Sequence, residues 1–259
     1  MSDTKFFKND VNSDIYIGTG AGTKLLKDIE NIKNSIKIIS PYLNRNYVEK
    51  LINLKNSGKD VSLITSDSIE DFYDNRNLHK LIIQNRTTID SAKAKRDFLI
   101  KCRNWMLIFA SVIPILFFVD LYIGKEPKIV YLILFSILYG IVIWILSSKI
   151  QWLRIYRYSY ETLFPIKVFL SPNAKDHFNR STFFIHSKVF IIDDKVAYMG
   201  SLNFTIGGFE TNFETRFRVT DIETIKGINN MFNELFCSNE NTYIEIEQFA
   251  KRIYKEPIN

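Results

Sequence analysis

The sequence predicts an α/β protein in which a mixed sheet flanked by helices is interrupted by an inserted transmembrane helical hairpin. Three observations support this fold class. Short apolar segments alternate with stretches of helical periodicity, one 45-residue block holds only four charged side chains, and strand-like segments stand on both sides of that block. The 259 residues are 46% apolar and 24% charged, a balance that excludes a disordered chain. With only two cysteines, a disulfide scaffold is also excluded.

The part before the block follows a strand–helix rhythm, which predicts a parallel or mixed sheet. Strands are expected at 14–18, 35–41 and 61–65, and helices at 25–32 and 47–56. The glycine run Gly18-Thr-Gly-Ala-Gly22 stands between the first strand and the first helix. It has neither the spacing of a dinucleotide-binding turn nor the lysine of a P-loop, so we expect a structural turn.

The part after the block predicts further strands and one amphipathic helix. The strands are expected at 166–170, 182–185, 188–192 and 196–199, and the helix over 222–235. Each part is too small to be convincing alone, and each has strands that need partners. We therefore expect residues 1–103 and 149–259 to form one domain, with the hairpin, residues 104–148, inserted between them.

The apolar block divides into two stretches of membrane-spanning length. Trp105–Ile123 has 19 residues with one charge, and Ile129–Leu146 has 18 residues with none. As helices they would be about 27–28 Å long, close to the thickness of the hydrocarbon core. The alternative is a buried hairpin in a soluble core, but such helices usually carry a polar stripe, and these do not.

The flanking charges predict the orientation of this hairpin. The N-terminus has no apolar signal segment. Basic residues concentrate outside the two spans: Lys93, Lys95, Arg96, Lys101 and Arg103 before them and Lys149, Arg154 and Arg157 after them, against Lys125 and Lys128 in the turn. By the positive-inside rule, the protein is a two-span membrane protein with its soluble domain and both termini in the cytoplasm.

The candidate chemistry lies in one segment, from His186 to Asn203, with the form H-x-K-x4-D-x6-G-S-x-N. Strand alternation would put His186 and Lys188 on one face. After Asp193 the chain returns to Gly200-Ser201, where a glycine allows a ligand close to the backbone. Imidazole, ammonium, hydroxyl and carboxamide groups together suit an anionic tetrahedral group. The alternative, a core histidine beside a surface lysine, does not explain why every position of the pattern is filled.

This segment resembles the HKD motif of the phospholipase D superfamily. Glu210-Thr-Asn212-Phe-Glu214 is similar to the family's asparagine and glutamate segment, and Ser40-Pro41-Tyr42 is similar to a family strand end. The resemblance implies a phospholipase D-like fold. The surroundings of His79 and His177 do not match a second motif. Resemblance to single-motif members implies a homodimer with one composite site on its two-fold axis.

The resemblance also implies roles for the site residues. One imidazole, His186, attacks phosphorus, and the same residue of the partner subunit protonates the leaving oxygen. Lys188 and Asn203 bind the phosphate oxygens, Glu214 fixes the tautomer of His186, Ser201 belongs to the catalytic set, and Asp193 supports the local fold. No cofactor is expected. No metal is expected either, because no cluster has metal-ligand spacing.

Three hypotheses for the function follow. The first is a membrane-anchored phospholipase that hydrolyses a phospholipid head-group ester through a phosphohistidine. The second is a membrane-tethered, metal-independent endonuclease acting on DNA or RNA, and the third is an idle interaction module. Residues 76–103 hold eight Lys and Arg against two Asp. A nuclease more often spreads its basic residues along a groove, so this juxtamembrane concentration favours a lipid.

Overall fold

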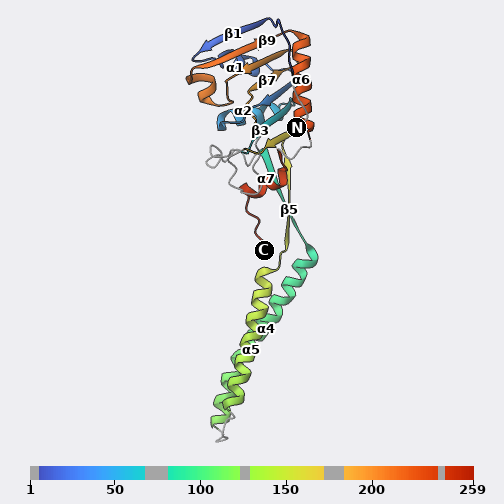
Figure 1. The fold of residues 1–259 in the computed structure, drawn as a ribbon. Helices are drawn as coiled ribbons and strands as arrows, with labels where there is room; N and C mark the ends of the chain where they lie inside the picture. Colours follow the sequence, from blue (N-terminus) through green and yellow to red (C-terminus); the bar gives the residue numbers. More distant parts are fainter. Residues whose placement is uncertain (1–5, 68–80, 123–128, 172–183, 239–242) are drawn as a thin grey trace. The chain divides into compact units, whose positions relative to one another are not determined.

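The structure, a computed structural model, describes residues 6–67, 81–122, 129–171, 184–238 and 243–259 (Figure 1). The chain divides into two compact units. Unit 1 comprises residues 1–84 and 160–254, and unit 2 comprises residues 85–159 and 255–259. Unit 1 therefore takes residues from both sides of the apolar block.

Unit 1 is built on an eight-stranded sheet with the order β1-β9-β8-β7-β2-β3-β6-β10. Strands β2, β3 and β6 are parallel to one another, and the other pairings are antiparallel. This arrangement confirms the predicted mixed sheet. The strands are β1 (Ser13–Gly18), β2 (Ser35–Ile39), β3 (Asp60–Ser66), β6 (Ile166–Phe169), β7 (Val189–Ile192), β8 (Val196–Gly200), β9 (Glu214–Val219) and β10 (Tyr243–Ile244).

The two sequence halves interleave at the centre of this sheet. On β2, Ile36 lies opposite Val61 of the parallel strand β3 and opposite Ile192 of the antiparallel strand β7. Strand β3 in turn pairs in parallel with β6, from the second half. The strands that each half lacks are thus supplied by the other half.

Alternation along the strands divides the core between two faces. On one face Phe190 and Tyr198 pack with α1 (Thr23–Glu30), α2 (Arg45–Asn56) and the short η1 (Gly207–Thr211). On the other face Ile191 and Val219 pack with α6 (Ile222–Cys237). A smaller cluster joins β10 to α7 (Ile246–Ile253). The sheet is therefore covered by helices on both faces.

The prediction of a strand at 182–185 is wrong for the two of these residues that the structure describes. Phe184 and Ile185 lie in irregular backbone, while 182 and 183 fall outside the described residues. His186 and Lys188 precede β7 instead of lying in it. The sequence pattern did not predict β4 (Ile82–Thr88), β5 (Tyr156–Thr162), β9, β10 and α7. The first two carry mostly polar residues and form a separate two-stranded sheet, so they show no buried-strand pattern.

Unit 2 contains two long helices, α4 (Asp90–Tyr122) and α5 (Ile129–Trp152). They are joined by a hydrogen bond from Tyr139 Oη to Met106 O of 2.8 Å. By length and composition, segments Asp90–Ile115 and Ile133–Trp152 are able to cross a membrane. Helix α4 begins at Asp90, well before the apolar stretch that starts at Trp105. The charged residues between these two positions are part of the same helix.

The last residues of the chain bind the end of α5. Asn259 Nδ2 donates to Gln151 O at 2.6 Å, and Ile155 N donates to Ile258 O at 2.7 Å. Arg154 pairs with Glu256 at 3.2 Å. The Asn259 amide thus donates to one of the carbonyl groups that a helix leaves without intrahelical partners at its C-terminus.

Candidate active site

The candidate site lies at one end of the strands in the sheet of unit 1. The parallel strands β2 and β3 finish there, where Ile39 lies opposite Ile64 and Val189. Antiparallel pairing therefore makes β7 and β9 begin there and β8 and β1 end there. We call this end of the sheet, where β2 and β3 finish, the carboxyl edge. In open α/β sheets, ligands bind outside the carboxyl ends of the parallel strands, so this edge is where a substrate is expected.

His186 and Lys188 are in direct contact at the carboxyl edge. Lys188 Nζ lies 3.1 Å from both ring nitrogens of His186 and donates to His186 O at 2.8 Å. Lys188 is buried and His186 is exposed. Burial lowers the pKa of Lys188, and the nearby carboxylate of Glu214 acts in the opposite direction. The pair thus presents an exposed imidazole with a buried cation beside it.

Ser201 and Glu214 form a second pair at the same edge, across β8 and β9. Ser201 Oγ donates to Glu214 Oε2 and accepts a hydrogen bond from Thr215 N at 2.9 Å. Asn212 Nδ2 lies 3.3 Å from Glu214 Oε1. Gly200 is required here, because a Cβ atom at this position would lie 2.0 Å from Thr215 O. The described contacts therefore hold Glu214 on Ser201 and Asn212, and a hydrogen bond from His186 to Glu214 stays a prediction.

Asn203 is fixed through its backbone. Its N and O atoms pack so tightly against Gly208 of η1 that a Cβ there would lie 2.8 Å and 2.4 Å from them. Its side-chain Oδ1 is buried and has no hydrogen-bond partner among the described residues. Buried acceptors are normally paired, so this oxygen still needs a hydrogen-bond donor, and any contact of Asn203 with a phosphate oxygen would have to use Nδ2.

Asp193 lies at the other end of β7, about 13 Å from the carboxyl edge by strand rise. Asp193 and Asp194 have φ values of 52° and 51° and form the turn between β7 and β8. The Asp193 carboxylate accepts hydrogen bonds from Lys33 N, Asn34 N and Ser35 N at 3.0, 2.6 and 2.9 Å. Burial alone would raise its pKa, but these amides outweigh burial and lower it. The structure thus places Asp193 apart from the other candidate residues.

Ser40 joins the end of β2 to the segment after Asn203. Its hydroxyl donates to Tyr42 O at 2.7 Å and accepts from Phe204 N at 3.0 Å. Tyr47, on α2, donates to Glu210 of η1 at 3.0 Å. The Ser40-Pro41-Tyr42 segment therefore positions the backbone of the site.

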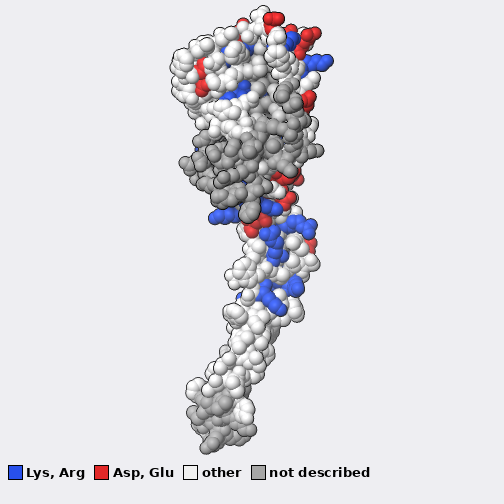
Figure 2. Space-filling view, in the orientation of Figure 1, with Lys and Arg blue, Asp and Glu red and all other residues white. Residues whose placement is uncertain are grey.

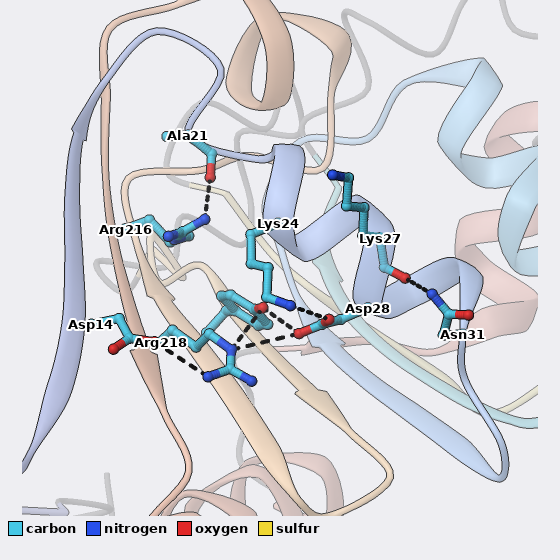
Figure 3. Close-up of polar contacts among 9 residues, drawn as sticks. Asp14, Ala21, Lys24, Lys27, Asp28, Asn31, Arg216 and Arg218 are labelled. Carbon is cyan, nitrogen blue, oxygen red and sulfur yellow. Dashed lines mark hydrogen bonds and ion pairs between the residues drawn. The ribbon is translucent and has the colours of Figure 1, made fainter.

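Sequence reasoning missed a polar network under α1 (Figure 3). Arg216 donates to Ala21 O at 3.2 Å, which ties the glycine run to β9. Arg218 Nε donates to Tyr198 Oη at 3.1 Å, and that hydroxyl donates to Asp28. Gly22 packs so closely that a Cβ would lie 2.5 Å from Phe209. The glycine run is therefore a packed structural turn, and the alternating arginines of β9 were the signal for the network.

His79 and His177 lie outside the described residues. Across the described ranges, no group of three or more His, Cys, Asp or Glu side chains is arranged to hold a metal ion.

Comparison with known proteins agrees with the motif. Residues 140–236 match a family model described as cardiolipin synthase, PLD-like domain. The chain is 33% identical over 75 residues to cardiolipin synthase 1 of Bacillus anthracis and 36% identical over 66 residues to the major cardiolipin synthase ClsA of Bacillus subtilis. These matches cover 29% and 25% of this chain, and each spans 14% of the relative's length.

Two solved structures are similar at a lower level. NucT from Helicobacter pylori is 14% identical, with a TM-score of 0.46, and the similarity covers 92% of this chain and 100% of that one. Nuc from Salmonella typhimurium, a phospholipase D family member, is 12% identical, with a TM-score of 0.42, over 90% and 97% of the two chains.

The family model and the two curated relatives place the part of the chain that carries the motif in the phospholipase D superfamily, whose members are phosphodiesterases and transferases. The segment from His186 to Glu214 lies wholly within the residues that the family model matches.

Proposed function

We propose that the protein is a membrane-anchored phosphodiesterase of the phospholipase D type that hydrolyses a phospholipid head-group ester through a phosphohistidine. The observation that carries this proposal is the contact between His186 and Lys188. An exposed imidazole, with a buried ammonium 3.1 Å from both ring nitrogens, stands at the carboxyl edge. This arrangement supplies a nucleophile together with a cation for the phosphate that it attacks.

The reaction proceeds in two displacements. A ring nitrogen of His186 attacks phosphorus, a P–N bond forms, and the P–O bond to the head group breaks. The leaving oxygen takes a proton from a second imidazole. Water then gives a proton to that imidazole and attacks phosphorus, and the P–N bond breaks. Lys188 and the Asn203 carboxamide stabilise the charge on the non-bridging oxygens.

The second imidazole comes from a second copy of the chain. In the part of the chain that the structure describes, His186 is the single histidine. A two-fold axis beside His186 brings the same residue of both protomers to one site. The proposed enzyme is therefore a homodimer with a composite active site.

Three features support a lipid substrate. The matched family model and both curated relatives carry the name cardiolipin synthase, and cardiolipin is a phospholipid. Helices α4 and α5 are long and apolar enough to cross a membrane. Five basic residues of α4 precede its apolar stretch, and Figure 2 shows basic side chains gathered beside the long uncharged region. Such a cluster attracts anionic lipid with about 1 kcal/mol per charge. The proposed orientation keeps unit 1 and both termini in the cytoplasm.

The test is an assay of detergent-purified protein on phosphatidylglycerol vesicles and on single- and double-stranded DNA and RNA. We expect head-group release from the lipid, abolished in His186→Asn, with the nucleic acids left intact. Nucleic-acid cleavage that His186→Asn abolishes would instead show a tethered nuclease. Wild-type protein without turnover on any of these substrates would reject the enzymatic proposal and favour an interaction module.

A further inference from the structure

Four large apolar side chains lie exposed near the carboxyl edge of unit 1. Ile15 and Ile17 of the edge strand β1 are 61% and 62% exposed, Phe217 of β9 is 37% exposed, and Phe213, directly before β9, is 75% exposed. Ile15 lies opposite Phe217, and Gly18 lies opposite Glu214. We call these four residues the β1–β9 patch. Clusters of this kind on soluble surfaces mark interaction sites.

Alternation explains why α6 leaves the patch uncovered. Arg216 and Arg218 point to the face of β9 that carries α1, so Phe217 and Val219 point to the face that carries α6. Val219 is buried against Ile225 of α6, whereas Ile15 and Ile17 on the neighbouring strand remain exposed. Within the described residues, the apolar face of the sheet thus extends beyond the helix that covers it.

We propose that the β1–β9 patch is the surface through which a second copy of this chain binds, so that its His186 reaches the same site. This inference rests on the proposed function, in which one chain supplies one of the two imidazoles. The proposed site is incomplete without a second copy, and the patch adjoins Glu214 of that site. The missing imidazole and this adjacency together select the second copy as the occupant.

The distances permit one interface to include both the patch and His186. Neighbouring strands lie about 4.8 Å apart, so the start of β7 is about 10 Å from β9 and about 14 Å from β1. A standard interface buries about 800 Å² per partner, a disc of about 16 Å radius. An interface of standard size centred at the start of β7 therefore reaches Ile17 and Phe213, the end of the patch nearest the site. Two-fold symmetry uses the patch twice, once on each side of the axis.

Edge-to-edge pairing of the two β1 strands would not bring the two copies of His186 to one site. Antiparallel pairing of β1 with its symmetry mate would carry the two carboxyl edges to opposite ends of a joined sheet. The two copies of His186 would then lie far apart. The contact must instead leave both carboxyl edges at the same end of the dimer.

The test compares Ile17→Lys and Phe213→Lys with the matched control Ile222→Lys. Ile222 is 79% exposed, but it begins α6 at the opposite edge of the sheet. The molar mass of the full-length protein in detergent is measured by light scattering over a range of concentrations, and unfolding temperatures are recorded in parallel. We expect the dimer dissociation constant to rise about tenfold or more in both patch variants. The Ile222→Lys control should match the wild type. Phe213 precedes β9, so Phe213→Lys tests the patch even where Ile17→Lys unfolds the edge strand.

A wild-type protein that stays monomeric, or folded patch variants that dimerise as tightly as the control, would overturn the proposal. Weaker binding of the patch variants to lipid vesicles with an unchanged dimer would also overturn it, because the occupant would then be the bilayer. The mass measurement needs no substrate. A dimer that the patch variants disrupt, but that hydrolyses no phosphodiester, would keep this interface and reject the proposed function.

Discussion

The ammonium nitrogen of Lys188 lies 3.1 Å from both ring nitrogens of His186. Because it contacts both nitrogens, a phosphoryl group on either of them would have oxygens within reach of the same cation. The Lys188 side chain is buried, so its charge is poorly solvated and acts strongly on a bound anion. The position of this single ammonium group links the fold of the segment before β7 to the stabilisation of charge in the proposed reaction.

The first prediction concerns the alkaline limb of activity. Burial lowers the pKa of Lys188 below its ordinary value of 10.5, so the ammonium loses its proton at a lower pH than a solvated lysine. We expect kcat/KM to fall as the pH rises through this lowered pKa. In Lys188→Arg the guanidinium stays charged at every accessible pH, so any remaining activity should lack that limb. A limb that persists unchanged in Lys188→Arg would assign it to another group.

The carboxylate of Glu214 provides an internal control for this assignment. Its charge raises the pKa of Lys188 against the effect of burial. Glu214→Gln removes the charge and keeps an oxygen for Ser201, so the alkaline limb should move to lower pH. Glu210→Gln is the matched variant, because Glu210 binds Tyr47 instead. Equal shifts in the two variants would contradict a direct effect of Glu214 on Lys188.

The second prediction concerns stability and Asp193. Three backbone amides hold its carboxylate and lower its pKa despite burial, so the charged form stabilises the fold. That contribution is complete above the ordinary pKa near 4 and disappears as the pH falls through the lowered value. Asp193→Asn keeps the residue's tolerance for positive φ and should lower the free energy of unfolding by about 1 kcal/mol at pH 7.

Chemical denaturation at several pH values measures the contribution of Asp193. The difference between wild type and Asp193→Asn should shrink as the pH falls through the lowered pKa of Asp193, where the wild-type carboxylate becomes protonated. Asp194→Asn is the control, because Asp194 has the same backbone conformation and contacts only Lys37, at 3.3 Å, among the described residues. A smaller loss in Asp193→Asn than in Asp194→Asn would reject the role of the three amides.

The sequence predicted the central strands because their apolar residues are buried whatever surrounds them, as in Val61 to Thr65. Strand β9 was missed because Arg216 and Arg218 alternate with apolar residues. Their face becomes interior only when Ala21, Asp28 and Tyr198 supply polar partners from distant parts of the chain. Such partners depend on tertiary structure, which local periodicity does not contain.

The candidate site, like the fold, was predicted only in part. The sequence predicted His186 and Lys188 on one face of a strand, but both residues precede β7, and their side-chain contact was not predicted. The grouping of Ser201 with Glu214 depends on the register of β8 on β9, which the sequence does not specify. Asp193 stands within the motif, yet the turn of the hairpin carries it to the other end of the sheet.

The third prediction is that hydrolysis does not require a divalent metal. The donors at the carboxyl edge are imidazole, ammonium, hydroxyl and carboxamide groups with one carboxylate, a set that binds Mg²⁺ or Ca²⁺ poorly. Activity should therefore persist in excess EDTA. Inactivation by the chelator, reversed by adding a divalent ion, would reject the two-histidine mechanism.

The fourth prediction concerns the membrane. If α4 and α5 span the bilayer, alkaline carbonate should leave the protein in the membrane pellet. Cys102 is half-buried and Cys237 is exposed, and both lie on the side proposed to be cytoplasmic. An impermeant thiol reagent should label Cys237 only after the cells are permeabilised. Release by carbonate would reject the spans, and labelling of intact cells would reverse the orientation.

The last prediction tests the composite site by mixing chains. His186→Asn removes both the nucleophile and the acid, so a dimer that contains one such chain has one imidazole and is inactive. When wild type and His186→Asn exchange subunits at a fixed total concentration, the active pairs form in proportion to the square of the wild-type fraction. Head-group release should follow that square, while a mixture measured before exchange should follow the fraction itself. Ile222→Lys, which lies away from the carboxyl edge, should leave activity unchanged when mixed in the same way. A linear dependence after complete exchange would mean that each chain acts alone, and the second imidazole would then have to come from the same chain.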